Sequence, residues 1–154
     1  MKARNIYLLL AKDVITDPVD NMNTLVKIID KFTSRVDESM INEQNSKLQG
    51  GQTTAVPVQY VIASAWAFDQ MLAKPTLVTT KMNIVDPNGK DLGGPEQEQE
   101  FPAKIDKVNL NFKSDALPIT KSGRYILKAK LLSKKGEELA NAEYSYEVEL
   151  IKPS

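Results

Sequence analysis

Apolar and polar residues alternate through much of this chain, and the alternation is clearest between residues 107 and 113. Val108, Leu110 and Phe112 are separated there by asparagines and flanked by Lys107 and Lys113. Successive side chains of a β-strand point to opposite faces, so a period of two predicts a strand with one buried and one solvated face. The segment 76–85 has the same period, and the Asp-Pro-Asn-Gly that follows it favours a tight turn.

A β-hairpin is predicted near the end of the chain. Residues 124–132 and 144–150 both alternate, and a Lys-Lys-Gly turn at 134–136 lies between them. The polar face of the first segment is basic and that of the second is acidic, so we expect lysines to face glutamates across the solvent side. Each such pair contributes about 0.2–1 kcal/mol. Tyr125 belongs to the opposite, apolar face.

Two segments, 5–12 and 56–69, are apolar on both faces. Strands of this kind lie inside a sheet or under a covering layer. Ala63, Ala65 and Ala67 make one face of the second segment small, which admits a close neighbour. That neighbour is either another part of the same chain or a subunit or ligand.

The pattern of residues 17–33 is ambiguous. It fits a helical stripe capped by Asn21 or Asn23, and it also fits a strand. We expect a strand at 24–33, because β-branched residues are dense there and the remaining segments predict strands.

Two polar stretches are the places where we look for a functional site. Residues 37–55 predict a long polar loop, with a short helix over 38–48 as an option. Loops longer than about 15 residues in a compact domain are usually functional or disordered. Residues 93–100 predict an acidic loop between strands.

The composition argues against an enzyme, because the chain contains no histidine and no cysteine. These side chains most often carry acid–base, nucleophilic and zinc chemistry near neutral pH. The 20 basic and 20 acidic residues give no net charge, which removes the long-range attraction of a general nucleic-acid or anionic-membrane binder. We therefore expect no catalytic, cofactor-binding or metal-binding residues, and neither nucleic acid nor a membrane as partner.

The length of 154 residues suits a single domain, which we place over residues 1–154. The apolar run at 6–11 is shorter than the roughly 7–15 apolar residues of a signal peptide and lacks a small-residue cleavage site. No stretch reaches the roughly 18 apolar residues that suggest a membrane span. These features predict a cytoplasmic protein.

A calcium site is one alternative that the sequence raises. Asp86, Asn88 and Asp91 resemble the opening of a calcium loop, and three glutamates follow within 96–100. An EF-hand has its glycine sixth and a glutamate twelfth, whereas here glycine is fourth and glutamine is twelfth. A hairpin turn with a solvated acidic loop is the simpler interpretation.

Three further chemistries are weaker. Asp69 follows an apolar stretch, which makes it a candidate for carboxylate catalysis, and it is equally well interpreted as the polar end of a strand. The basic residues of 124–135 prompt nucleic-acid binding, but Tyr125 faces away from the charges of its strand. A sugar site needs exposed aromatic rings, whereas Trp66, Tyr144 and Tyr146 lie on apolar faces.

The order of several sequence segments along the chain resembles that of a known protein family. An apolar strand at 7–13 is followed by TLVKIID at 24–30, a central strand, KMNIVDPNG at 81–89 and SGRYIL at 122–127. This order resembles a family of small, uncharacterised bacterial β-sandwich proteins of the immunoglobulin-like type. The resemblance covers most of the chain and implies the fold, but it implies no activity, cofactor or functional residue.

We expect an all-β, immunoglobulin-like sandwich of seven to nine mostly antiparallel strands with one long polar loop. The expected core consists of Ile6, Leu8, Leu10, Ile28, Tyr60, Ile62, Trp66, Phe68, Ile84, Leu110, Phe112, Tyr125, Leu127, Leu131, Tyr146 and Val148. The expected function is a non-catalytic cytoplasmic module that acts through protein–protein contacts or as a homo-oligomer. The alternative is a binder of a small sugar or lipid-like ligand, and the third option is a carboxylate- or calcium-dependent enzyme.

Overall fold

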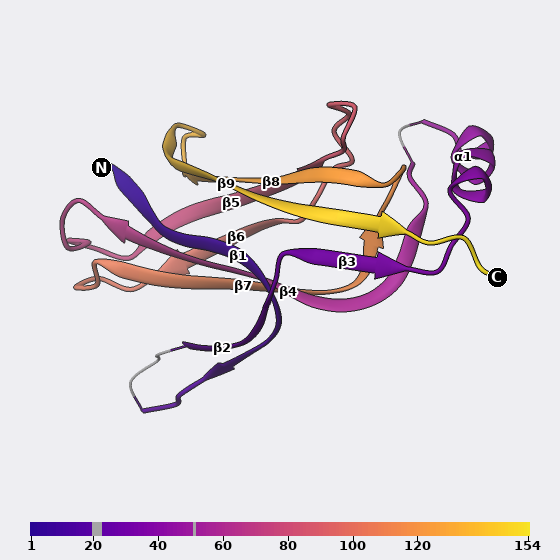
Figure 1. Ribbon diagram of the computed structural model, residues 1–154. Coiled ribbons are helices and arrows are strands. Elements are labelled where there is room, and N and C mark those ends of the chain that lie inside the picture. The colour runs from indigo at the N-terminus through magenta and orange to yellow at the C-terminus, as the bar shows by residue number, and fades with distance from the viewer. Residues whose placement is uncertain (20–22, 51) are drawn as a thin grey trace.

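Two β-sheets packed face to face make up the protein (Figure 1). The structure is a computed structural model that describes residues 1–19, 23–50 and 52–154. The elements within these residues are β1 (Ala3–Thr16), β2 (Asn23–Ile29), β3 (Lys31–Ser34), α1 (Glu38–Lys47), β4 (Ala55–Phe68), β5 (Thr76–Val85), β6 (Glu96–Phe101), β7 (Lys107–Pro118), β8 (Gly123–Ser133) and β9 (Glu138–Leu150). Within the described residues, α1 is the one α-helix. No helix among these residues is long and apolar enough to cross a membrane.

The strand order confirms an all-β sandwich. The first sheet has the order β2-β1-β4-β7 and is antiparallel throughout. The second sheet has the order β3-β9-β8-β5-β6, and in it only the β3–β9 pair among the described strands is parallel. β1 and β4, the two strands with apolar residues on both faces, each have a neighbour on either side, as the sequence predicts.

The core lies between the sheets and contains a satisfied polar pair. Ser64 is fully buried, and its hydroxyl donates to the Leu110 carbonyl at 3.0 Å. The Trp66 indole N–H in turn donates to the Ser64 hydroxyl at 3.1 Å. A buried polar group costs free energy unless it is hydrogen-bonded, so these two bonds allow serine and tryptophan to share the core.

The prediction of a core position is wrong for two residues. Ile6 is 46% exposed because the β1–β4 register shifts between Asn5 and Tyr7, and this irregularity interrupts the alternation so that Leu8 rather than Ile6 faces the core. Ile28 is 55% exposed because it lies on β2, an edge strand of the first sheet that leaves the body of the sandwich (Figure 1).

Phe112 is half-buried rather than buried, because β7 is an edge strand. The other predicted core residues are buried.

The predicted strand at 24–33 is present as two strands instead of one. The chain bends at Asp30 and passes from β2 in the first sheet to β3 in the second. The Asp30 carbonyl accepts a hydrogen bond from the Glu147 amide at 2.8 Å, which fixes the crossing against β9. The helical alternative capped by Asn23 is wrong, and the cap at Asn21 lies outside the described residues.

The predicted acidic loop at 93–100 is partly wrong, because its second half is strand β6, paired with β5. Backbone pairing holds this strand in place, and the side chains of residues 96–100 are exposed on both faces. Because the side chains of residues 96–100 are exposed on both faces, the sequence of this strand has no alternation of apolar and polar residues and resembles that of a loop.

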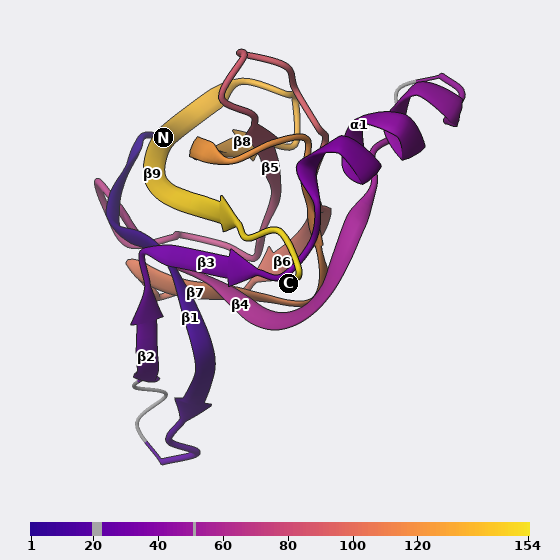
Figure 2. The ribbon, with the colours of Figure 1, turned by 45° about the vertical axis from the view of Figure 1, so that its right-hand side comes forward.

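The long polar segment contains the short helix that the sequence left as an option, and the helix caps one end of the sandwich (Figure 2). The Asp37 carboxylate accepts from the Ser39 hydroxyl and amide at the N-terminus of α1, and these bonds lower the pKa of Asp37. Ile41 is buried in the core. The Asn45 side chain accepts from the Thr54 amide at 2.7 Å and donates to the Ile119 carbonyl at 3.4 Å. This segment therefore has a structural role.

Candidate functional site

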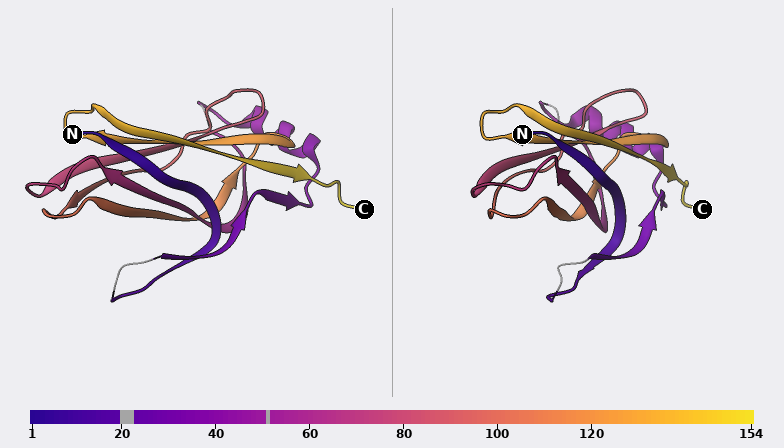
Figure 3. Two further views of the ribbon diagram at one scale, coloured as in Figure 1. Left: turned by 60° about the vertical axis from the view of Figure 1, so that its left-hand side comes forward. Right: turned by 90° about the vertical axis from the view of Figure 1, so that its left-hand side faces the viewer.

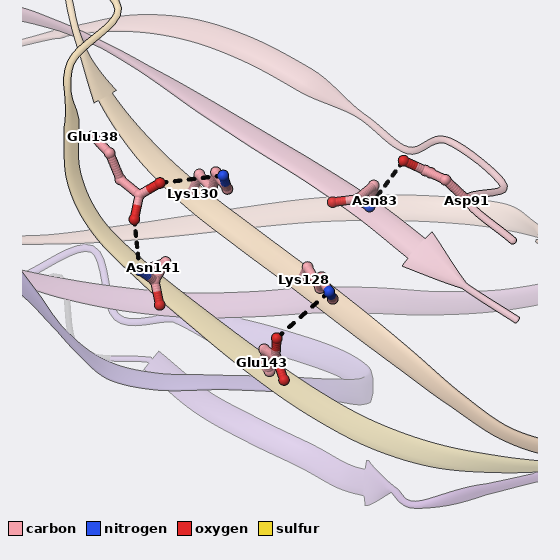
Figure 4. Close-up of polar contacts among 7 residues, drawn as sticks. All are labelled: Asn83, Asp91, Lys128, Lys130, Glu138, Asn141 and Glu143. Carbon is pink, nitrogen blue, oxygen red and sulfur yellow. Dashed lines mark hydrogen bonds and ion pairs between the residues drawn. The ribbon is translucent and has the colours of Figure 1, made fainter. Parts of the chain in front are cut away.

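The basic residues of β8 face the acidic residues of β9, as predicted (Figure 4). Lys128 lies 3.7 Å from Glu143, and Lys130 lies 3.2 Å from Glu138, which also accepts from the Asn141 side-chain amide. Arg124 and Glu147 form a further pair at 3.2 Å. These cations already face carboxylates, so this sheet face carries a row of solvent-exposed ion pairs between β8 and β9.

The segment 86–91, which resembles the opening of a calcium loop, is a hairpin turn. Hydrogen bonds to its own carboxylates stabilise it. Asp86 Oδ1 accepts from the amides of Asn88 and Lys90, and Asp86 Oδ2 accepts from the Thr120 hydroxyl at 2.7 Å. The Asp91 carboxylate accepts from the Gly93 amide and from the Asn83 side chain (Figure 4). Among the described residues, no cluster of three carboxylates converges on a point that could hold a metal ion.

The remaining residues weighed for chemistry also have structural positions. Asp69 is exposed just after β4, which fits the polar end of a strand. Trp66 and Tyr146 are buried in the core, so neither ring is available for stacking on a sugar. Tyr144 is half-buried, and its hydroxyl donates to the Ile29 carbonyl at 2.8 Å.

The hairpin formed by the end of β1 with β2 leaves the body of the sandwich (Figures 1 and 2). We call residues 12–19 and 23–29 the arm. Ile15, Val19 and Ile28 on the arm are all more than half exposed. A hairpin of two strands is marginally stable alone, and these apolar side chains of the arm remain in contact with water.

The arm turns back under the first sheet (Figure 3). The Asn23 side-chain amide lies 3.4 Å from the Tyr7 hydroxyl, although Asn23 pairs with Thr16 at the far end of β1. Ala63 and Ala65 are buried on this outer face, opposite Leu9 and Tyr7 of β1. The small face of β4 is therefore next to larger residues of its own chain, the first of the two alternatives that the sequence left open.

A groove of about 700 Å³ lies between the arm and the first sheet. Lys12 and Asp13 line it from the arm, and Lys113 and Asp115 line it from β7. The structure shows no ion pair among these four side chains, all of which lie within the described residues. The groove is open and carries charges of both signs.

A second opening, which we call the cleft, lies on the side of the sandwich where β7 and β6 are the edge strands. Its volume is about 390 Å³. Residues of both sheets line it, and its apolar lining consists mainly of Ile62, Ile84, Leu92, Pro95, Phe112 and Pro118. The half-burial of Phe112 is thus explained by its position at an opening into the core.

One wall of the cleft is the segment 92–95, which continues β6 along β5. The Ile84 amide donates to the Gly93 carbonyl and the Met82 amide donates to the Pro95 carbonyl, both at 2.9 Å. A Cβ on Gly94 would lie 2.3 Å from the Met82 carbonyl oxygen, so glycine alone allows this close approach.

The polar groups of the cleft are few. The Tyr60 hydroxyl donates to the Ala116 carbonyl at 3.2 Å, and burial raises the pKa of Tyr60, which keeps the phenol neutral. Lys113 is exposed at the cleft and has no ion pair within the described part of the chain. Asn111 also lines the cleft, and its side-chain oxygen is buried without a hydrogen-bond partner among the described residues.

Sequence reasoning missed the cleft. It placed Phe112 and Ile62 in a closed core, because alternation shows which face of a strand is apolar but not whether the facing sheet extends far enough to cover it. The signal available was β7 itself, since an apolar face on an edge strand is only partly covered.

The chain matches no protein-family model and no curated protein. Among solved structures, 61% of the chain is similar to a β-glucuronidase of Bacteroides uniformis, at 12% identity and a TM-score of 0.49. A glycosyl hydrolase family 2 member of Bacteroides cellulosilyticus DSM 14838 matches 63% of the chain, at 14% identity and a TM-score of 0.42. An alkylpurine DNA glycosylase of Pseudomonas fluorescens, solved with DNA, matches 92% of the chain, at 10% identity and a TM-score of 0.38.

These three proteins are much longer than the matched region, since this chain spans 12%, 14% and 30% of their respective lengths. Similarity at this level assigns neither a family nor an activity. The resemblance to small bacterial immunoglobulin-like proteins stays a prediction.

Proposed function

We propose that this chain is a non-catalytic module that acts through contacts with another polypeptide. The observation that carries the proposal is the cleft, where apolar residues of both sheets meet solvent between two edge strands. Exposed strand edges and exposed apolar surface are features that proteins use to bind one another. The described residues that line the cleft include no carboxylate, which supports binding rather than acid–base catalysis.

The proposal includes an immunoglobulin-like fold and a cytoplasmic location. The Tyr125 hydroxyl donates to the Lys121 carbonyl at 2.7 Å. This bond resembles the tyrosine corner of immunoglobulin-like sandwiches and supports that part of the proposal. Fractionation of the native host cell tests the location, and recovery of the chain outside the cytoplasm would contradict it.

A small-ligand binder is the second candidate. The cleft volume of about 390 Å³ lies within the range of roughly 300–1,000 Å³ that is typical of small-molecule sites. Its lining is mostly apolar, which favours a lipid-like ligand over a sugar.

Native mass spectrometry of the full chain, purified gently from its own host, separates the two candidates. A co-purifying protein supports the contact module, and a small additional mass on the 17.1 kDa chain supports the ligand binder. Ala116→Trp fills the cleft and is expected to remove whichever partner occupies it. Met71→Ser changes an exposed residue outside both the cleft and the arm and is the control.

The arm supplies a surface for self-association, which belongs to the same proposal. Ile15, Val19 and Ile28 would lose contact with water between two copies, and a chain with no net charge does not repel itself. Multiples of 17.1 kDa in the same spectra are the expected result. Replacement of Ile15 and Ile28 by serine should return the species to monomer, and multimers unaffected by that change would exclude the arm.

A further inference from the structure

We propose that the groove between the arm and the first sheet is the contact surface between two copies of this chain, in which the arm of each copy packs into the groove of the other. Self-association through the arm belongs to the proposed function, on which this inference rests. The groove adds the surface that receives the second arm and the charges that select it.

One face of the arm is largely apolar and looks into the groove. The β1–β2 register places Ile15, Val26 and Ile28 on the same side of the two strands, together with Asp13. Val26 and Asp13 line the groove, so this side of the arm is the one that faces it. Val61 of β4 lines the groove from the sheet. Ile15 and Ile28 remain more than half exposed, so their own chain leaves this face uncovered.

The charged side chains that line the groove are not paired within the chain. Lys12 and Asp13 lie on the arm side, and Lys113 and Asp115 lie on the side of β7. All four are exposed, and none of them has an ion pair within the described part of the chain. The groove therefore presents two positive and two negative charges that remain available to a partner.

The balance of these charges makes the groove complementary to a second copy of itself. Most soluble homo-oligomers are two-fold dimers, in which the same patch of both chains meets across the symmetry axis. The lysines of one groove would then face the aspartates of the other, whereas a partner of uniform charge would meet two like charges. Asp17 and Lys27, the other charged residues of the described arm, lie outside the lining and also balance each other.

The outer face of the second sheet is the competing surface for a second copy, and its ion pairs argue against it. Lys128 and Lys130 of β8 already lie beside Glu143 and Glu138 of β9. A second copy placed there would compete with these pairs for the same charges. The groove, by contrast, combines unpaired charges of both signs with exposed apolar side chains on one wall.

Two charge variants of the full-length chain test the contact. Lys12→Glu with Lys113→Glu makes all four lining charges acidic, and Asp13→Lys with Asp115→Lys makes all four basic. Like charges then meet across the symmetry axis, so each variant alone should have its dimer dissociation constant raised more than about tenfold. An equal mixture of the two variants should form a heterodimer, because every acidic side chain then meets a basic one. The four side chains are exposed, so neither variant should lose the fold.

Sedimentation equilibrium gives the mass of the assembly, and methyl NMR gives the place of contact. We expect the unchanged chain to sediment at twice 17.1 kDa and to dissociate on dilution. The methyl signals of Ile15 and Ile28 on the arm should shift as the dimer dissociates. Those of Ile62 and Ile84 in the cleft should remain in place.

Lys134→Glu with Lys135→Glu is the matched control for net charge. It changes the charge of the chain by the same amount as the acidic groove variant, at an exposed turn outside the groove and the arm. The control should dimerise like the unchanged chain. A control that dissociates as readily as the acidic groove variant would make net charge the cause and would contradict the groove as the site.

Three further outcomes would overturn the inference. They are an unchanged chain that remains monomeric at about 1 mM, a dimer that persists in both charge variants, and a mixture of the two variants that stays monomeric. A monomer that leaves its host with a different protein bound would support the contact module while contradicting this contact between copies. A monomer that carries a small additional mass would favour the small-ligand candidate and contradict both.

Discussion

The rings of Tyr125 and Tyr146 stack in the core with centroids 5.6 Å apart and planes inclined by 20°, but their hydroxyl groups differ in bonding. The Tyr125 hydroxyl donates to the Lys121 carbonyl and accepts from the Thr120 amide at 3.0 Å. The Tyr146 hydroxyl is buried and has no hydrogen-bond partner among the described residues. Burial raises the pKa of Tyr146 far above its ordinary value, so this phenol remains neutral.

Replacing each of these tyrosines by phenylalanine should therefore have different results. Tyr125→Phe removes hydrogen bonds to half-buried backbone groups of Thr120 and Lys121 and should lower the free energy of unfolding by about 0.5–1.5 kcal/mol. Tyr146→Phe removes a polar group that makes no bond and should be neutral or stabilising by up to about 1 kcal/mol. Urea denaturation of the two variants provides the measurement. An equal loss in both would show that the Tyr146 hydroxyl has a bonding partner.

The helix α1 should contribute to stability through Ile41, which is buried in the core. Ile41→Ala should lower the free energy of unfolding by about 2–4 kcal/mol, the usual range for a buried isoleucine. Met40→Ala, an exposed neighbour on the same helix, is the control and should stay within about 0.5 kcal/mol. Deletion of residues 37–54 should then prevent folding, and a deletion variant that keeps its melting temperature would contradict this role.

Gly94→Ala tests the wall of the cleft. The new methyl group would lie 2.3 Å from the Met82 carbonyl oxygen, so the segment 92–95 has to move away from β5. We expect a loss of about 1–3 kcal/mol in the free energy of unfolding. Gly50→Ala is a useful comparison, because Gly50 has φ +56° and open space around it, and so reports the left-handed conformation without a collision. If the two losses were equal, steric contact at Gly94 would be excluded as the cause.

Glu138 provides a prediction for pH. Its carboxylate accepts from the Asn141 side-chain amide and pairs with Lys130, and these contacts lower the pKa of Glu138 below its ordinary value (Figure 4). A carboxyl group with a lowered pKa in the folded state stabilises the fold above its ordinary pKa, and this stabilisation is lost as the pH falls through the folded-state value. Glu138→Gln should therefore be less stable than the unchanged chain at neutral pH and equally stable in acid. Thermal unfolding from pH 7 down to pH 3 measures the difference, and a gap that persists at the acid end would contradict it.

Much of the local structure could be predicted from alternation. The strand at 76–85 has the predicted bounds, and the lysines of β8 face the glutamates of β9 across the predicted hairpin. The faces of Tyr125 and Leu127 follow directly from the period of two. Segments such as β6 were missed, because an exposed edge strand needs only backbone pairing and leaves no apolar pattern.

The candidate site could be predicted only in part. Phe112 and Ile62 were recognised as apolar residues that point inward, but not as the lining of an opening. The polar segment at 37–54 was suspected as a site and instead closes one end of the fold, because Ile41 reaches the core from a helix of mostly polar residues.

The sequence by itself determined the all-β class, the two central strands and the inward faces of the regular strands, because side-chain alternation is a local property of an extended backbone. The tertiary structure decided that a register shift turns Ile6 outward, that the chain changes sheets at Asp30, and that β7 and β6 are edges with a cleft between them. These features depend on which strands pair, and strand pairing joins residues far apart in the chain whose contacts no local pattern encodes.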